Sequence, residues 1–210
     1  VVCGVNEEGH REVLAVEPMA EESEASYTEV FRKLKERGMA TPRLVVSDAH
    51  TGLVLAIRKE FPGASWQRCK VHFMRNILAH VPQRDKETFA LELKEIWLAP
   101  DGDEARKRAD RFIAKYEKKY PKAIKRLDEG LEDSLSYYAF PHIEAKKISS
   151  TNMLERLNRE IRRRSRVVGI FPNEDSYTRL ITIHLIEHSE EWSTARGGYF
   201  SPGSIQSMLE

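Results

Sequence analysis

The sequence predicts an α/β protein in which a wholly helical segment interrupts a region of strands and helices. Short apolar runs bounded by turn residues lie within residues 1–69. Residues 82–147 show helical periodicity and no strand pattern, and helical periodicity continues after residue 150. We expect four parts: a first core segment (1–74), an all-helical insertion (75–147), a second core segment (148–190) and a loosely packed tail (191–210).

The first 38 residues predict a hairpin followed by a helix. Residues 1–5 and 11–16 are the expected strands, and Asn6 and Gly9 supply the turn between them. The helix is predicted over 21–38 and ends at Gly38. Its buried stripe is expected to contain Tyr27, Val30, Phe31 and Leu34.

Two further strands and two helices are predicted next. The fully apolar residues 44–46 form a short strand typical of a sheet covered on both faces, and Asp48 follows its carboxyl end. Ligands bind at that end of the strands in α/β sheets. The alternative is that Asp48 only caps the following helix. The elements expected after this strand are a helix (49–61), a strand (64–69) and a helix (71–80).

The insertion is expected to fold on its own. Its helices are predicted near 85–98, 103–119, 121–129 and 131–139, with breaks at residues 100–102 and at Pro121. The residues expected to pack its interior are Phe112, Tyr116, Tyr120, Leu127, Leu131 and Leu135.

Residues 150–173 predict a capped helix that carries one carboxylate among many arginines. Ser150 or Thr151 can cap its start, and Glu155 lies in the first turn. The stripe Leu154, Leu157 and Ile161 has the spacing of a buried face, and Arg156, Arg159, Arg162, Arg163, Arg164 and Arg166 crowd the rest. Such a density of arginine suits a phosphate backbone. The alternative is a solvated helix in which Glu155 pairs with Arg159.

The segment after this helix is predicted to be extended and then helical. Asn173 is expected to cap a helix over 176–189. The periodic residues of that helix are Leu180, Ile183, His184 and Glu187.

Composition sets few limits on function. The net charge of +1 says nothing about nucleic acid, so only the local clustering of charge is informative. No run of 18 apolar residues is present, which predicts no membrane span. Two cysteines do not make a disulfide framework, and cytoplasmic residence is expected.

Four motifs together resemble one known family. LVVSDAHTGL (44–53), SWQRCKVHFMRN (65–76), TNMLERLNREIRRR (151–164) and VVGIFPN (167–173) closely resemble the Mutator-like transposases of bacterial insertion sequences. The resemblance implies a DDE transposase with an RNase H-like catalytic core and a helical insertion before the catalytic Glu. It also implies a bacterial cytoplasmic protein that acts on element ends and target DNA, with a homodimer expected at full length.

The resemblance assigns roles to particular residues. Asp48 matches the family's second catalytic Asp and Glu155 its catalytic Glu, both as ligands of Mg²⁺ or Mn²⁺. Two such ions can activate a hydroxyl and stabilise the reacting phosphate, so the two carboxylates are expected roughly 4–8 Å apart although 155 − 48 = 107 residues separate them. Apart from the resemblance, the local density of arginine predicts DNA contacts by Arg156, Arg159, Arg162, Arg163 and Arg166. His50, two residues after Asp48, could contact a phosphate or the scissile strand, and the alternative is a surface histidine.

The family's first catalytic Asp lies on a strand upstream of a segment like residues 1–9. The chain is therefore expected to be a C-terminal piece that lacks this strand and has no strand-transfer activity alone. The hairpin 1–16 and the strand 44–46 are then expected not to pair directly. Two other functions stay open: a non-catalytic DNA-binding remnant, and a nuclease of the same fold.

Cys69 and His72 match the family's C-x-x-H signature, whose role the resemblance does not give. The spacing suits a metal, but zinc needs about four ligands. Cys3 and His50 could be recruited, although a packed cysteine and a hydrogen-bonded histidine is the preferred interpretation. Trp66 and Trp97 could stack on bases but are expected in the core.

Overall fold

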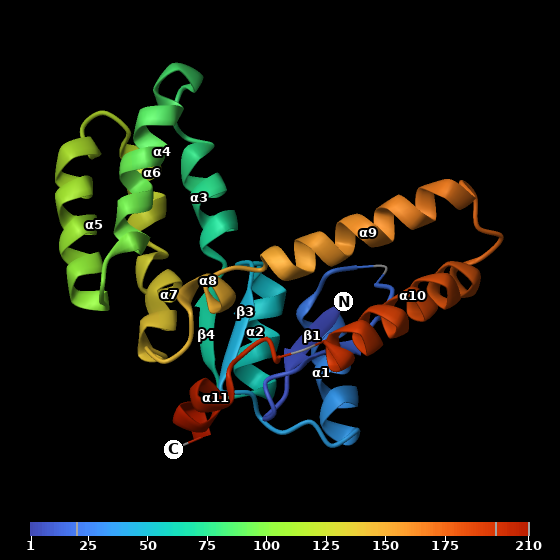
Figure 1. Ribbon diagram of the computed structural model, residues 1–210. Coiled ribbons are helices and arrows are strands. Elements are labelled where there is room, and N and C mark those ends of the chain that lie inside the picture. Colours follow the sequence, from blue (N-terminus) through green and yellow to red (C-terminus); the bar gives the residue numbers. More distant parts are fainter. Residues whose placement is uncertain (20, 196, 210) are drawn as a thin grey trace. The chain divides into compact units, whose positions relative to one another are not determined.

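The computed structural model describes residues 1–19, 21–195 and 197–209 (Figure 1). The fold is mixed α/β, mostly helical with two small sheets. The chain divides into two compact units, which are described separately below. The first unit comprises Val1–Arg43, His50–Ala64 and Asn152–Glu210, and the second comprises Leu44–Ala49 and Ser65–Thr151.

The second unit contains a parallel strand pair. β3 (Leu44–Ser47) pairs with β4 (Ser65–Arg68), with Leu44 opposite Ser65 and Ser47 opposite Arg68. Both strands lie within one residue of their predicted ranges, 44–46 and 64–69. The ladder continues past the strand ends, because the Cys69 N–H donates to the Ser47 carbonyl at 2.7 Å.

The rest of the second unit is helical, as predicted for the insertion. The residues expected to pack its interior are all buried. Phe89 joins them, and its ring contacts those of Phe112, Tyr116 and Tyr120 at centroid distances of 4.8–5.5 Å. The elements are α3 (Lys70–Leu78), η1 (Gln83–Asp85), α4 (Lys86–Lys94), η2 (Glu95–Leu98), α5 (Gly102–Tyr116), α6 (Pro121–Asp128), α7 (Leu131–Leu135), η3 (Ser136–Ala139) and α8 (Ala145–Ile148).

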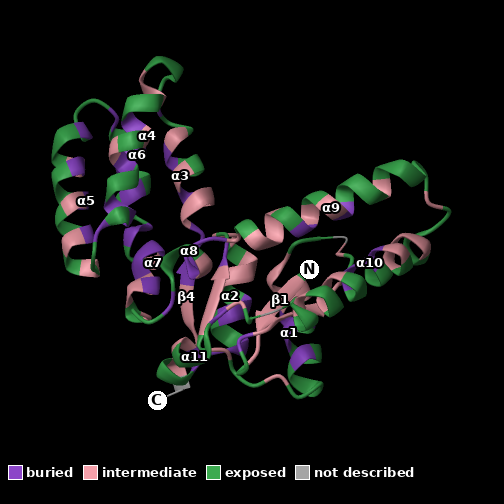
Figure 2. Ribbon diagram, viewed as in Figure 1, coloured by how far each residue is buried: buried purple, intermediate pink, exposed green. Residues whose placement is uncertain are grey.

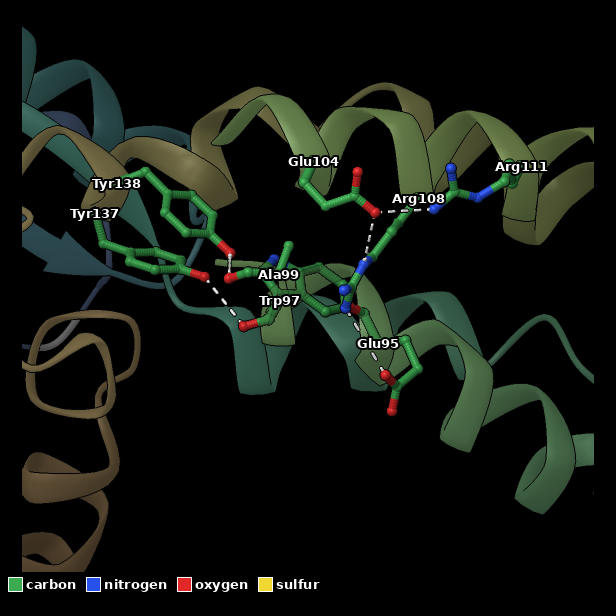
Figure 3. A network of polar contacts seen from close by, with 8 residues as sticks. All are labelled: Glu95, Trp97, Ala99, Glu104, Arg108, Arg111, Tyr137 and Tyr138. Carbon is green, nitrogen blue, oxygen red and sulfur yellow. Dashed lines mark hydrogen bonds and ion pairs between the residues drawn. The ribbon is translucent and has the colours of Figure 1, made fainter. Parts of the chain in front are cut away.

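A buried polar network ties β4 to these helices. Gln67 is fully buried in β4; its amide donates to the Ser134 carbonyl at 2.9 Å and accepts from the Tyr137 N–H at 2.8 Å. Ser134 in turn accepts from the Trp97 indole at 3.0 Å. In Figure 3 the Tyr137 hydroxyl donates to the Trp97 carbonyl, and Tyr138 donates to Ala99. Because every member has a partner, the network fixes β4 on the helices at little desolvation cost.

Surface ion pairs add to the same region. Figure 3 shows Glu104 accepting from Arg108 and Arg111 on its own helix, α5. Arg108 also reaches the carboxylate of Glu95 at 3.8 Å. Exposed pairs of this kind contribute little each, so the buried network rather than the ion pairs positions the strand.

The first unit begins with the predicted hairpin. β1 (Val2–Val5) and β2 (Arg11–Ala15) pair antiparallel across a turn closed by Asn6 and His10. α1 (Glu24–Glu36) packs against α2 (Thr51–Glu60) and buries Val30, Phe31 and Leu34 of the predicted stripe. α1 starts later than predicted because Ser23 and Ser26 form a capping box.

Two long helices complete the first unit. α9 (Asn152–Val168) packs through Leu157 and Ile161 onto Ile181 and Leu185 of α10 (Glu174–Thr194). The buried face of α10 therefore differs from the prediction: Ile181 and Leu185 are inside with His184, whereas Ile183 is exposed. Apolar residues occur on several faces of α10, so the face that is buried depends on how α10 packs against α9.

The residues after α10 also depart from the expectation of a loose tail. α11 (Pro202–Leu209) follows, and Phe200 and Ile205 are buried. The Phe200 N–H donates to the Gly9 carbonyl at 3.1 Å. Gly9 has a φ of 83°, and a Cβ there would lie 2.5 Å from the Phe200 carbonyl oxygen, so the hairpin turn needs glycine to accept this segment.

The described strands form two separate two-stranded sheets, β1–β2 and β3–β4. This agrees with the expectation that the hairpin does not pair directly with the strand before Asp48. No helix in the described ranges is both long and apolar enough to cross a bilayer.

Gln67→Leu should destabilise the chain by roughly 2–4 kcal/mol, because it leaves the Tyr137 N–H and the Ser134 carbonyl buried without their partner. The free energy of unfolding from urea denaturation measures this change. Gln83→Leu, at an exposed position in η1, is the matched control and should shift it by less than about 0.5 kcal/mol. Equal effects of the two substitutions would show that the network does not hold β4.

Candidate active site and nucleic-acid surface

Asp48 lies directly after β3 with its side chain exposed. The neighbouring Ser47 fixes the backbone there: its hydroxyl donates to the Asp48 carbonyl at 2.7 Å and accepts from the Trp66 indole at 2.9 Å. The N-cap position of α2 is His50, so Asp48 does not occupy it. The structure thus presents an accessible carboxylate at the carboxyl end of a fixed strand, which is where α/β proteins bind ligands.

Cys69 is fully buried at the start of α3 and has contacts on two sides. Its backbone N–H donates to Ser47, the residue before Asp48. Its thiol sulfur accepts from both the backbone N–H and the hydroxyl of Thr151, each at 3.3 Å. The next residue reinforces this junction, because the Lys70 N–H donates to the Ser149 carbonyl at 3.0 Å.

Cys69 is thus packed in the interior, and its sulfur accepts hydrogen bonds. His72 lies half-buried in the first turn of α3. Among the described residues, no group of three or more His, Cys, Asp and Glu side chains is placed to hold a metal. Cys3 packs against the α9–α10 core, and burial raises the pKa of its thiol to about 11, which disfavours the thiolate that zinc requires.

Glu155 lies half-buried in the first turn of α9, where a carboxylate is favoured by the helix dipole. It follows Thr151 by four residues in the sequence. The predicted stripe behind it is confirmed, since Leu157 and Ile161 are buried and Leu154 is half-buried. α9 is therefore held by its apolar face, which leaves its other side available.

All the arginines of α9 are exposed, as Figure 2 shows along the outer part of that helix. Two have acidic partners: Arg163 pairs with Glu160 at 2.9 Å, and Arg164 approaches Glu187 at 3.9 Å. Within the part of the chain that the structure describes, the others form no ion pair. These are Arg156, Arg159, Arg162 and Arg166. The salt-bridged alternative thus applies to two arginines, and the rest keep their charge available to an anion.

The two tryptophans and His50, also considered from the sequence, differ in their surroundings. Trp97 is buried and hydrogen bonded, which confirms a core role. Trp66 is half-buried with its indole directed to Ser47. The ring of His50 meets that of Tyr27 edge-on at 5.9 Å, both within the first unit.

Sequence reasoning missed the functions of Ser47 and Thr151. The sequence offered Ser150 or Thr151 as the cap of α9, and it did not reveal that the Thr151 hydroxyl donates to Cys69. Asn173 does cap α10 as predicted, accepting from the Ser176 N–H at 2.8 Å. The run Ser149–Ser150–Thr151 just before a helix was a signal for backbone hydrogen bonding, but it did not reveal the distant partner.

Comparison with known proteins shows which family the chain resembles. The family described as "Transposase, Mutator family" matches residues 1–195. The transposase for insertion sequence element IS256 in transposon Tn4001 of Staphylococcus aureus is 42% identical over 194 residues, covering 91% of this chain and 50% of that protein.

Two further relatives give the same coverage. The transposase for ISRM5 of Rhizobium meliloti is 40% identical, covering 93% of this chain and 49% of the relative. The transposase for IS1081 of Mycobacterium tuberculosis is 39% identical, covering 93% and 47%. The chain spans about half the length of the curated relatives that it matches.

Cys69→Ala should lower the free energy of unfolding by about 1–2 kcal/mol, because it removes the acceptor for two part-buried donors of Thr151 and empties a fully buried position. Cys69→Ser, which keeps an acceptor, should cost less, and Thr151→Val should reproduce part of the alanine effect. Urea denaturation measures all three. Stoichiometric zinc in the purified protein that disappears in Cys69→Ala would instead make Cys69 a metal ligand.

A second prediction concerns pH. Burial lowers the pKa of His184, helped by the nearby Arg164 and His188 and opposed by Glu187. The unfolded chain, with a histidine pKa near 6.5, then binds more protons than the folded chain. Stability should therefore be complete above about pH 7 and fall as the pH drops below about 6.5.

His184→Gln should flatten this dependence, whereas the same substitution at the exposed His80 should not. Thermal unfolding at a series of pH values measures it. An unchanged slope in His184→Gln would assign the acid sensitivity to other groups.

Proposed function

Because the chain belongs to the Mutator family of transposases, we propose that it supplies part of the catalytic core with which such an enzyme cleaves and joins DNA. In this proposal the core is RNase H-like, and Asp48 and Glu155 are two members of a DDE set. The observation that carries the proposal is the junction at Cys69. That residue hydrogen-bonds both Ser47, next to Asp48, and Thr151, four residues before Glu155.

The donor chemistry suits a hard cation. Asp48 is an exposed residue with a carboxylate side chain, and Glu155 is half-buried in the first turn of a packed helix. Oxygen ligands of this kind select Mg²⁺ or Mn²⁺ over zinc. Such ions, when bound, lower the pKa of an attacking hydroxyl and neutralise charge on the reacting phosphate.

The protein's own residues have defined tasks in this proposal. Ser47 holds the backbone next to Asp48, and Cys69 holds Thr151, which precedes Glu155 by four residues in the sequence. Arg159 and Arg162 lie exposed on the helix that carries Glu155, where they can bind DNA phosphates and align the scissile strand. In this proposal the arginines position the DNA strand, and the carboxylates hold the metal ions that promote its cleavage.

A DNA-binding remnant without catalysis is the competing function. It uses the same arginines but not the carboxylates, so substitutions at the two kinds of residue separate the two functions. Dimerisation of a full-length protein and contact with both element ends and target DNA are further parts of the transposase proposal.

Asp48→Asn and Glu155→Gln should each reduce transposition by at least about a hundredfold, because each removes a metal-binding carboxylate. The measurement is transposition in cells of a marked element, with the chain in its natural gene. Glu160→Gln changes a carboxylate on the same helix that pairs with Arg163, and it should retain activity. Activity that survives both carboxylate substitutions would leave only the DNA-binding function.

Replacing Arg159 and Arg162 by Ala should weaken DNA binding on all sequences and flatten the plot of log affinity against log salt by about one unit per lost phosphate contact. Fluorescence anisotropy at several salt concentrations measures the slope. Alanine at Lys107 and Lys118, exposed on or beside α5, removes the same charge and should leave the slope nearly unchanged. Equal slopes for the arginine variant and the unchanged chain would mean that α9 does not bind phosphates.

A further inference from the structure

The turn between α9 and α10 presents aliphatic side chains to solvent. Val167 is 87% exposed, Val168 50% and Ile170 89%. These three residues with Gly169 are called the α9 tip below. Figure 2 shows the tip as exposed, beyond the core through which α9 and α10 pack. Contiguous exposed apolar surface, unlike single scattered residues, marks interaction sites in soluble proteins.

The tip is a built turn rather than a frayed helix end. Gly169 has a φ of 77°, which reverses the chain, and the Ile170 N–H donates to the Val168 carbonyl at 3.0 Å. Just beyond it, the ring of Phe171 packs edge-on against Tyr177 at 5.1 Å, and Asn173 caps α10. These contacts fix the turn so that Val167 and Ile170 remain outside.

The positive charge beside the tip indicates what kind of molecule the tip contacts. The last turns of α9 carry Arg162, Arg163, Arg164 and Arg166, and Arg162 and Arg166 form no ion pair within the described residues. The nearest acids in sequence, Glu174 and Asp175, lie beyond the turn at the start of α10, where they complement its dipole. Three aliphatic side chains are too few for a protein interface of the usual ~1,600 Å². An apolar point next to unpaired arginines instead suits a nucleic acid.

We propose that the α9 tip inserts into a DNA duplex as an apolar wedge, with Val167 and Ile170 entering between unstacked bases while Arg162 and Arg166 hold the flanking phosphates. This inference rests on the proposed function, to which it adds a contact with distorted DNA. Wedges of this kind unstack and kink duplexes in other DNA-binding proteins. Glu155 and the tip lie at opposite ends of α9, so a kink at the tip would bend the DNA that the arginines between them hold.

The test uses the full chain and a duplex of about 30 base pairs with a central two-nucleotide bulge, beside which 2-aminopurine reports unstacking. The unchanged chain should bind this probe about tenfold more tightly than the fully paired duplex and should raise the 2-aminopurine fluorescence. Val167→Ser with Ile170→Ser should abolish both the preference and the rise. The salt slope should stay the same, because no phosphate contact is lost.

Ile183→Ser is the matched control, since Ile183 is 59% exposed on α10 and outside the tip. Thermal unfolding checks that the double variant folds. Salt-dependent binding by the unchanged chain without preference or fluorescence rise would overturn this inference alone. Absence of DNA binding would overturn the proposed function as well. Loss of self-association in the tip variant, measured by sedimentation, with unchanged DNA binding would assign the tip to a second copy of the chain.

Discussion

The hydrogen bonds at Cys69 are the constraint on which the proposed site depends. The backbone of this one residue extends the β3–β4 pairing to Ser47, and its sulfur accepts two hydrogen bonds from Thr151. Each partner lies a short distance along the chain from a carboxylate. A thiol sulfur is a weak acceptor, but it has no water to compete with in a fully buried position. These contacts describe Cys69 as a packed, hydrogen-bonded residue of the C-x-x-H motif.

The helical part of the second unit is hydrogen bonded to β4, the strand that leads to Cys69. Gln67 lies in β4 two residues before Cys69, and its amide is hydrogen bonded to the segment around Ser134 and Tyr137. An insertion that merely separated two halves of a core would need no buried polar contact with a strand. The observed network indicates that the helices hold β4, and through β4 the strand that precedes Asp48.

α9 carries apolar, acidic and basic side chains at distinct places on one helix. Leu157 and Ile161 fix the helix in its unit, Glu155 lies at its beginning, and the arginines occupy the outer side. The buried face was readable from the spacing of apolar residues, as were the strands β3 and β4 and the aromatic interior of the helical segment. Short apolar runs and a strict helical period leave few alternatives there.

Other features could not be read from the sequence, for physical reasons. α10 carries apolar residues on several faces, so which one is buried depends on the partner helix. The hydrogen bond from Thr151 to Cys69 spans 82 residues, and no local pattern encodes a contact at that distance. The packing of Phe200 on Gly9 depends likewise on a distant turn whose glycine is needed for close approach. The catalytic roles of Asp48 and Glu155 are implied by the family resemblance, and their joint binding of a metal ion is a proposal.

The most direct test of that chemistry is anomalous diffraction from crystals soaked in Mn²⁺. The account predicts a manganese peak bound by carboxylate oxygens of both Asp48 and Glu155, with the two carboxylates roughly 4–8 Å apart. Carboxylates more than about 12 Å apart, or manganese held only by other residues, would contradict it.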